Sequence, residues 1–308
     1  MSKIVFVTGA AGYIGGSVAA KLVKAGYQVK GLTRSEAKVE GLKSLGIEPI
    51  VGSLADAELV TQCALQADVV VDAADSDNLQ AVKTIIAALS GSDKIFIHTS
   101  GSTTVADRAN GEPSPAIFTE ATEFQADEHK LARVAIDNLV IESAKQGIRS
   151  AVICPCMIYG KGLGFKTESI QIPKMIKQAI AGGVAKCIGR GQNIWSTVHI
   201  EDLADLYLTV IEKAPAGGLF LFAENGEVSF RQLADKIKEA LELKSDVEEW
   251  PIEQAIAEWS FEGAVLAFGS NSRIRGVKSR ELGWTPKHNS VLDDVRRACA
   301  NLTSLARS

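Results

Sequence analysis

The sequence predicts an α/β fold: a doubly wound parallel sheet with a smaller C-terminal α/β lobe. Short apolar runs alternate with stretches of helical spacing through the first half of the chain, as in βαβ units. A glycine-rich turn joins the first apolar run to the first helical stretch. The chain has 308 residues, 46% of them hydrophobic, which is enough for one large domain and a second lobe.

The glycine-rich turn follows a β-branched and aromatic run over residues 4–9. Gly9 permits a sharp exit from the strand, and Gly12 has no side chain to keep a pyrophosphate from the backbone. Gly15 lets the following helix pack close to the sheet, with its N–H groups facing the phosphates. A tight turn that binds nothing is the alternative. The residues of this turn that we expect at a dinucleotide are Gly9, Gly12, Tyr13, Ile14 and Gly15.

The second strand, residues 28–34, ends in Thr33-Arg34-Ser35. An NAD-preferring fold usually places Asp or Glu here, to bond the adenine ribose hydroxyls. Arg34 would instead pair with a 2′-phosphate, and Thr33 and Ser35 can donate to it. We therefore predict NADP(H) as the cofactor; a solvated surface arginine is the alternative.

Three more strands follow at 48–52, 68–74 and 94–102, separated by helices at 36–45, 57–67 and 77–90. Ala73 and Ala74 are small enough to let the chain pass close to the cofactor. Ser100 belongs to the hydroxyl-rich end of its strand. Ligands of such sheets bind beyond the carboxyl ends of the strands, where all of these residues fall.

Four motifs resemble those of the short-chain dehydrogenase/reductase superfamily, of the extended or atypical, NAD-dependent epimerase/dehydratase-like type. Residues 8–15 match its TGxxGxxG turn, 154–160 resemble RPxxxYG, 198–204 resemble VHVDDLA, and 280–286 resemble LGWxP. The resemblance implies a Rossmann fold that binds NADP(H). It divides the chain into a cofactor domain over 1–160 and a mainly substrate-binding lobe over 161–308, with 185–212 returning to the Rossmann sheet.

The catalytic residues depart from that family's pattern. The resemblance implies a Ser or Thr, for which Ser100 fits, and a Tyr-x-x-x-Lys pair. None of the four tyrosines has a lysine four residues on. On a helix over 127–145, His129 and Arg133 occupy the two positions and share one helical face. His129 would exchange a proton and Arg133 would bond the ribose, unless both are solvated; a shifted alignment would make Lys130 the cation.

Cys154-Pro155-Cys156 suggests redox or metal chemistry at first sight. We predict no metal, because the four histidines are dispersed and nearby ligands are too few. The resemblance places Pro155 and Cys156 beside the nicotinamide, where backbone groups hold the carboxamide. A reactive Cys156 is the alternative, although no neighbour marks a lowered pKa.

The second half is less regular. The glycine-rich loop 161–165 is expected at the substrate mouth, and Trp195 either lines the pocket or fills the core. Ser229 and Gln232 have capping-box spacing. The aromatic residues of 245–275 suit a hydrophobic pocket, and 290–305 suits a closing helix.

Composition excludes several classes of function. The net charge is −4 without a basic run, so nucleic acid is not expected as a partner. No apolar stretch is long enough to span a membrane, and residues 1–3 lead straight into a strand, leaving no room for a signal peptide. Five scattered cysteines favour a reduced, cytoplasmic protein. The resemblance also allows a homodimer.

Together these features predict an NADP(H)-dependent oxidoreductase acting on a small, fairly apolar carbonyl or alkene. A non-redox isomerase or cyclase on the same fold is one alternative, because it would not need the missing tyrosine. A non-enzymatic regulator that senses the dinucleotide is the other. Oxidation of the cofactor with turnover would favour the oxidoreductase, and turnover without consumption of cofactor would favour the isomerase or cyclase. Dinucleotide binding with only protein partners would favour the regulator.

Overall fold

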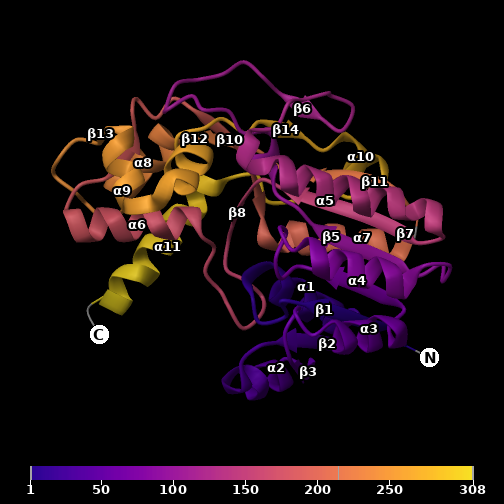
Figure 1. Cartoon of the computed structure of the whole chain (residues 1–308). Coiled ribbons are helices and arrows are strands. Elements are labelled where there is room, and N and C mark those ends of the chain that lie inside the picture. The colour runs from indigo at the N-terminus through magenta and orange to yellow at the C-terminus, as the bar shows by residue number, and fades with distance from the viewer. Residues whose placement is uncertain (1, 214, 307–308) are drawn as a thin grey trace.

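Most strands of the first half form the parallel sheet that the alternating strands and helices predict, and β11 of the second half completes it (Figure 1). The structure, a computed structural model, describes residues 2–213 and 215–306. Seven strands lie in the order β3-β2-β1-β4-β5-β7-β11, and all neighbours pair in parallel. The strands are β1 (Ile4–Thr8), β2 (Gln28–Thr33), β3 (Glu48–Val51), β4 (Val69–Asp72), β5 (Ile95–Thr99), β7 (Arg149–Pro155) and β11 (Leu219–Ala223).

Helices cover both faces of this sheet, which is therefore doubly wound. Val5 and Val7 of β1 pack into one apolar layer with residues of α1 and α7, whereas Phe6 packs into the other with α3, α4 and α5. This alternation follows from the two-residue period of a strand. The helices of this part are α1 (Tyr13–Lys24), α2 (Val39–Ser44), α3 (Ala57–Gln66), α4 (Leu79–Leu89), α5 (Leu131–Glu142) and α7 (Ile200–Lys213).

A second lobe lies beside the carboxyl ends of the strands, with its own apolar core (Figure 1). Its helices are α6 (Gln171–Gly182), α8 (Phe230–Ala240), α9 (Ile252–Phe261), a π-helix over Glu262–Phe268, and α11 (Val291–Ala306). Its short strands are β8 (Met157–Tyr159), β9 (Lys186–Ile188), β10 (Ile194–His199), β12 (Glu227–Ser229) and β13 (Glu248–Trp250). β10 lies between β8 and β12, and β9 pairs with β13. Outside both, β6 (Phe118–Thr119) pairs with β14 (Ile274–Arg275), which precedes α10 (Val277–Glu281).

The prediction that residues 185–212 return to the Rossmann sheet is wrong for the two strands of this range. β9 and β10, which fall in this range, pair within the second lobe, and only α7 packs on the sheet, beside α1. The strand that rejoins the sheet is the later β11, which runs parallel to β7. Both β10 and β11 form strands, but β11 (Leu219–Ala223) is the one that pairs with the edge of β7.

Several local predictions for the second lobe are confirmed, and one is not. Ser229 and Gln232 form both hydrogen bonds of a capping box at the start of α8. Trp195 is buried and donates its indole N–H to Ser270 O at 2.9 Å, so it fills the core. Trp259 packs edge-on against Trp250 and also against Phe268; these aromatics form core rather than a pocket wall. Among the described residues, no helix combines the length and apolarity needed to cross a bilayer.

Candidate dinucleotide site and the polar cluster beside it

The turn between β1 and α1 is shaped so that only glycine fits its key positions. Gly9 has φ +67°, and a Cβ there would lie 2.8 Å from the carbonyl oxygen of Ala73. A Cβ on Gly15 would lie 2.5 Å from the carbonyl oxygen of Gly9. Gly12 is the N-cap of α1 and no side chain caps the helix, so its first N–H groups are open to a ligand. The cradle and the open helix terminus fit a pyrophosphate.

A cavity of about 650 Å³ lies over this turn, at the carboxyl ends of β1, β2, β3 and β4. Seven of the residues predicted for the cofactor line it: Gly9, Gly12, Thr33, Arg34, Ser35, Ala73 and Ala74. The other five, Tyr13, Ile14, Gly15, Pro155 and Cys156, are outside its lining. Tyr13 is buried and donates its hydroxyl to Gly160 O at 2.8 Å, so its side chain ties α1 to the loop after β8.

The cavity is basic at the end of β2. Besides Arg34, Lys38 and Lys166 line it, against a single carboxylate, Asp75. Neither lysine is among the residues predicted for the cofactor from the sequence. Lys38 follows Arg34 by four residues on the short helix after β2, a spacing that was visible in the sequence. No pattern in the neighbouring sequence marks Lys166, because only the tertiary fold brings it to the cavity.

Lys166 lies on the loop between β8 and α6 and lines the cavity. This loop passes beside α1 and α2 (Figure 1). Leu163 donates its backbone N–H to Ser17 Oγ of α1 at 3.0 Å. A Cβ on Gly164 would lie 2.4 Å from the carbonyl carbon of Gly16, and Phe165 lies against Gly41 of α2. The glycine-rich loop that sequence analysis expected at the substrate mouth therefore packs over the cofactor-binding end of the sheet. We call residues 161–167 the strap.

Ser100 directly follows β5 and is almost completely buried. Its hydroxyl donates to Asp137 Oδ2 of α5 at 2.6 Å. Burial raises the pKa of the Asp137 carboxyl to about 6, against the opposing effects of the Ser100 hydrogen bond and of His98 and Arg133. Asp137, which sequence analysis did not select, is thus the buried acid in contact with the predicted catalytic serine.

His129 and Arg133 do not share a helical face, contrary to the sequence-based prediction. The α-helix begins only at Leu131, and His129 belongs to a preceding 3-10 turn that the Asp127 side chain caps by accepting from His129 N. His129 Nδ1 lies 2.9 Å from Asp127 Oδ1, and its half-exposed ring packs on Phe261 with centroids 4.9 Å apart. The cap fixes this turn and directs the ring toward the second lobe.

Arg133 points instead toward the start of α4. Its guanidinium makes two bonds to the Asp77 carboxylate, at 2.9 and 2.5 Å, and a third to Thr103 Oγ1 at 3.1 Å. These hydrogen bonds lower the pKa of Asp77. Lys130, the alternative cation, is buried and bonds Glu262 Oε2 of the second lobe at 2.8 Å.

The surroundings of Cys154 and Cys156 do not favour reactive thiols. Both thiols are buried, and burial raises the pKa of each above its usual value. Cys156 Sγ donates to Ala223 O at 3.2 Å. This environment argues against a reactive Cys156.

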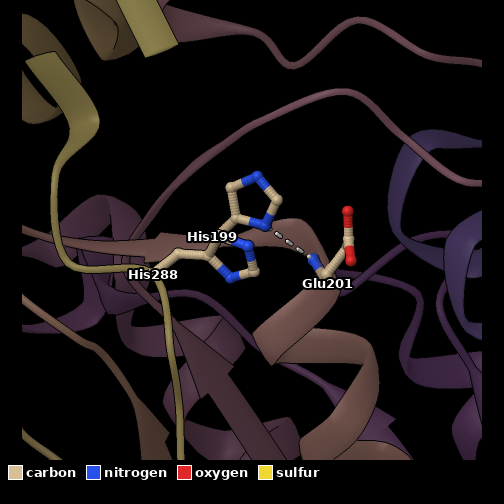
Figure 2. A group of neighbouring side chains, drawn as sticks. All are labelled: His199, Glu201 and His288. Atoms are coloured by element: carbon tan, nitrogen blue, oxygen red, sulfur yellow. Dashed lines mark hydrogen bonds between the residues drawn. The ribbon is translucent and has the colours of Figure 1, made fainter. Parts of the chain in front are cut away.

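One group of metal-ligating side chains comes together within the described residues: His199, Glu201 and His288 (Figure 2). His199 Nδ1 already accepts from Glu201 N at 3.2 Å, so its Nε2 carries the hydrogen. The two imidazoles stack, with centroids 3.9 Å and planes 20° apart, so their lone pairs do not converge on one point. His288 Nδ1 lies 3.0 Å from Asp202 Oδ1. The group is better explained as a junction between α7 and the loop before α11 than as a metal centre.

The fold and the glycine turn define a dinucleotide-binding α/β protein. The chain matches the model of the NAD dependent epimerase/dehydratase family over residues 5–221, and it belongs to that family.

Three similar proteins illustrate the range of its relatives. The chain is 28% identical to the oxidase ucsJ of Acremonium sp., over 93% of both chains. It is 25% identical to a 4-hydroxy-2-methyl-3-oxo-4-farnesyl-3,4-dihydroquinoline-1-oxide ketoreductase of Stigmatella aurantiaca, over 95% of this chain and 96% of the relative. The crystal structure of dTDP-glucose 4,6-dehydratase from Bacillus anthracis, solved with NAD, superposes with a TM-score of 0.77 at 17% identity, covering 98% of this chain and 97% of that one. This last likeness shows a shared fold.

Proposed function

We propose that the protein is an NADP(H)-dependent oxidoreductase that acts on a small, fairly apolar carbonyl or alkene. The observation that carries the proposal is that Arg34, Lys38 and Lys166 all line the cavity, and three cations support the binding of a 2′-phosphate. The family is described as NAD dependent, and relatives include an oxidase and a ketoreductase. Five buried free thiols support a reducing compartment such as the cytoplasm.

In this proposal each part of the site has a distinct task. The N–H groups at the start of α1 hold the pyrophosphate, and the three cations hold the 2′-phosphate. The nicotinamide, when bound, supplies or accepts a hydride. Ser100 polarises the substrate oxygen, and His129 remains a candidate proton donor. Phe261, partly exposed against His129, supports an apolar substrate.

The deciding experiment is a binding titration with NADPH and with NADH. We expect wild type to prefer NADPH, and Arg34→Ala to weaken NADPH about tenfold to hundredfold with little change for NADH, because only the phosphate pairs with the guanidinium. Arg296→Ala is the matched control, since Arg296 is an exposed, ion-paired arginine outside the cavity. Preference for NADH in wild type, with Arg34→Ala unchanged, would rule out the NADP(H) assignment.

A non-redox isomerase or cyclase is the second candidate. The observation in its favour is that Arg133, which the resemblance matches to the family's ribose-binding lysine, is held by Asp77 and Thr103. An enzyme of this kind would convert its substrate without net oxidation of NADPH. Following product by mass spectrometry and NADPH by absorbance in the same reaction separates the two candidates.

A further inference from the structure

A line of buried polar side chains runs across the carboxyl ends of three neighbouring strands. Thr8 Oγ1 of β1 donates to Asp72 Oδ1 of β4 at 2.6 Å, and Asp72 Oδ2 lies 2.9 Å from His98 Nδ1 of β5. Beyond His98 come Asp137 and Ser100, joined by their own 2.6 Å hydrogen bond. All five side chains are buried, and Ser100, at 6%, is the most exposed of them. The line therefore runs from the cofactor turn to the predicted catalytic serine.

The line has one gap, between His98 Nε2 and Asp137 Oδ1. These atoms are 3.9 Å apart, and neither has a hydrogen-bond partner among the described residues. A buried polar atom without a partner is costly, and a charged one more so. The Asp72 carboxylate fixes the His98 proton on Nδ1, so Nε2 presents a lone pair toward Asp137 unless the ring is protonated. The pair thus has a place for one additional proton, on the carboxyl group or on the imidazole.

Charged and titratable groups face Asp137 from four parts of the fold. His98 lies on β5, Arg133 one turn earlier on α5, Asp77 before α4, and Cys154 on β7. Arg133 and His98 favour the carboxylate, whereas burial and Asp77 favour the neutral acid. Desolvation is the largest of these effects, and it keeps the Asp137 carboxyl protonated up to about pH 6.

The protonation state of Asp137 also sets the direction of the Ser100 hydroxyl. An ionised Asp137 can only accept, so Ser100 must point its hydrogen inward. A neutral Asp137 can donate through Oδ2, which frees the Ser100 hydrogen to point toward a substrate oxygen. Proton supply and hydroxyl orientation are therefore coupled at one contact.

We propose that Ser100, Asp137 and His98 form the proton reserve of this site, and that they supply the proton that a catalytic tyrosine would otherwise donate. The proposal rests on the oxidoreductase function above, because it assumes a substrate oxygen that becomes negative. Ser100 is the catalytic residue of the three. Asp137 and His98 act through it as positioning residues.

The substrate in this step is a carbonyl that accepts a hydride from a reduced nicotinamide dinucleotide. The hydride adds to the carbonyl carbon, and the π-bond electron pair moves to oxygen. That oxygen takes the Ser100 hydrogen, and Ser100 Oγ takes the proton of the Asp137 carboxyl group. Asp137 is left as a carboxylate, and the pair of Asp137 and His98 takes one proton from water before the next turnover.

The first test needs no substrate. Carboxyl carbon-13 spectra of aspartate-labelled protein, recorded from pH 4 to 8, should contain one carboxyl that titrates near pH 6 and is missing in Asp137→Asn. His98→Gln should move that titration to higher pH, because it removes the positive charge that the ring can carry and that favours the Asp137 carboxylate. A reserve is excluded if no aspartate titrates above pH 5, or if the His98 variant leaves the midpoint unchanged.

The second test uses a carbonyl that the wild type reduces with NADPH. Asn at position 137 keeps the shape of Asp but has no acidic proton, so Asp137→Asn should lower kcat about a hundredfold or more with little change in KM. It should also abolish the change of kcat between pH 5 and 7. Ser143→Ala, which removes a buried serine hydroxyl elsewhere, is the control and should keep wild-type kcat.

Two outcomes separate this proposal from its rivals. If Asp137→Asn retains kcat while His129→Ala loses it, His129 is the proton donor and the reserve is wrong. If the wild type reduces no carbonyl at all, the proposed oxidoreductase function fails, and the spectroscopic titration still decides whether Asp137 and His98 share a proton.

Discussion

At the scale of single residues, Asp137 couples the stability of the fold to pH. Its pKa rises from 3.8 unfolded to about 6 in the fold, so the native state binds more protons between these values. This contribution to stability is fully present below about pH 4 and is lost as pH rises through about 6. Relative to Asp137→Asn, the wild type should therefore lose about 2 kcal/mol of unfolding free energy between pH 4 and 7. Urea denaturation of both proteins at several pH values measures this difference.

The comparison provides its own control. A loss of packing or of the Ser100 hydrogen bond in Asp137→Asn would shift the free energy of unfolding by the same amount at every pH. A difference between the two proteins that stays constant from pH 4 to 7 would contradict the raised pKa of Asp137.

At the scale of elements, the strap brings a residue of the second lobe to the cofactor-binding end of the sheet. Its path depends on Gly164, where a Cβ would lie 2.4 Å from Gly16 of α1. Gly164→Ala should push the strap outward, remove Lys166 from the cavity and weaken NADPH binding about tenfold, the effect of losing one exposed charge pair with phosphate. Isothermal titration calorimetry measures the affinity.

Gly182→Ala is the matched control for this change. Gly182 lies in the last turn of α6, where an added Cβ would meet the end of the flexible Gln178 side chain at 3.2 Å and Val184 only at 4.0 Å. Wild-type NADPH affinity in Gly164→Ala would show that the strap takes no part in binding the cofactor.

At the scale of the whole molecule, the two halves of the chain are interleaved rather than sequential. β11 pairs with β7, and α7 covers the sheet beside α1. Tyr207 of α7 is buried, with its hydroxyl 2.7 Å from Thr99 Oγ1 at the end of β5. A fragment of residues 1–160 would lack both elements and expose their apolar contact surfaces. We expect this fragment to aggregate or to bind a hydrophobic dye strongly, as judged by size-exclusion chromatography and dye fluorescence.

The full-length chain, purified in the same way, is the control for the fragment. A monodisperse fragment with a native-like near-ultraviolet circular dichroism spectrum would show that residues 1–160 fold on their own, and that α7 and β11 are accessory to the cofactor domain.

The sequence predicted what is encoded locally. Strands and helices of the first half follow from two-residue and helical spacing within each segment, and the turn at Gly9 follows from residues adjacent in the chain. Arg34 was found for the same reason, because it directly follows β2. Lys38 also lies close to the end of β2 in the chain, but no general rule connects its position to the ribose.

By itself, then, the sequence determined the class of fold, the glycine turn and the basic residue at the end of β2, because each depends on neighbours along the chain. Tertiary structure decided which strand completes the sheet, since β10 and β11 differ in the edge they can reach and not in their local pattern. It also brought Lys166 to the cavity and set Asp137 and His98 beside Ser100. Those contacts join segments distant in the chain, and the burial that tunes Asp137 exists only once the layers of the fold have closed around it.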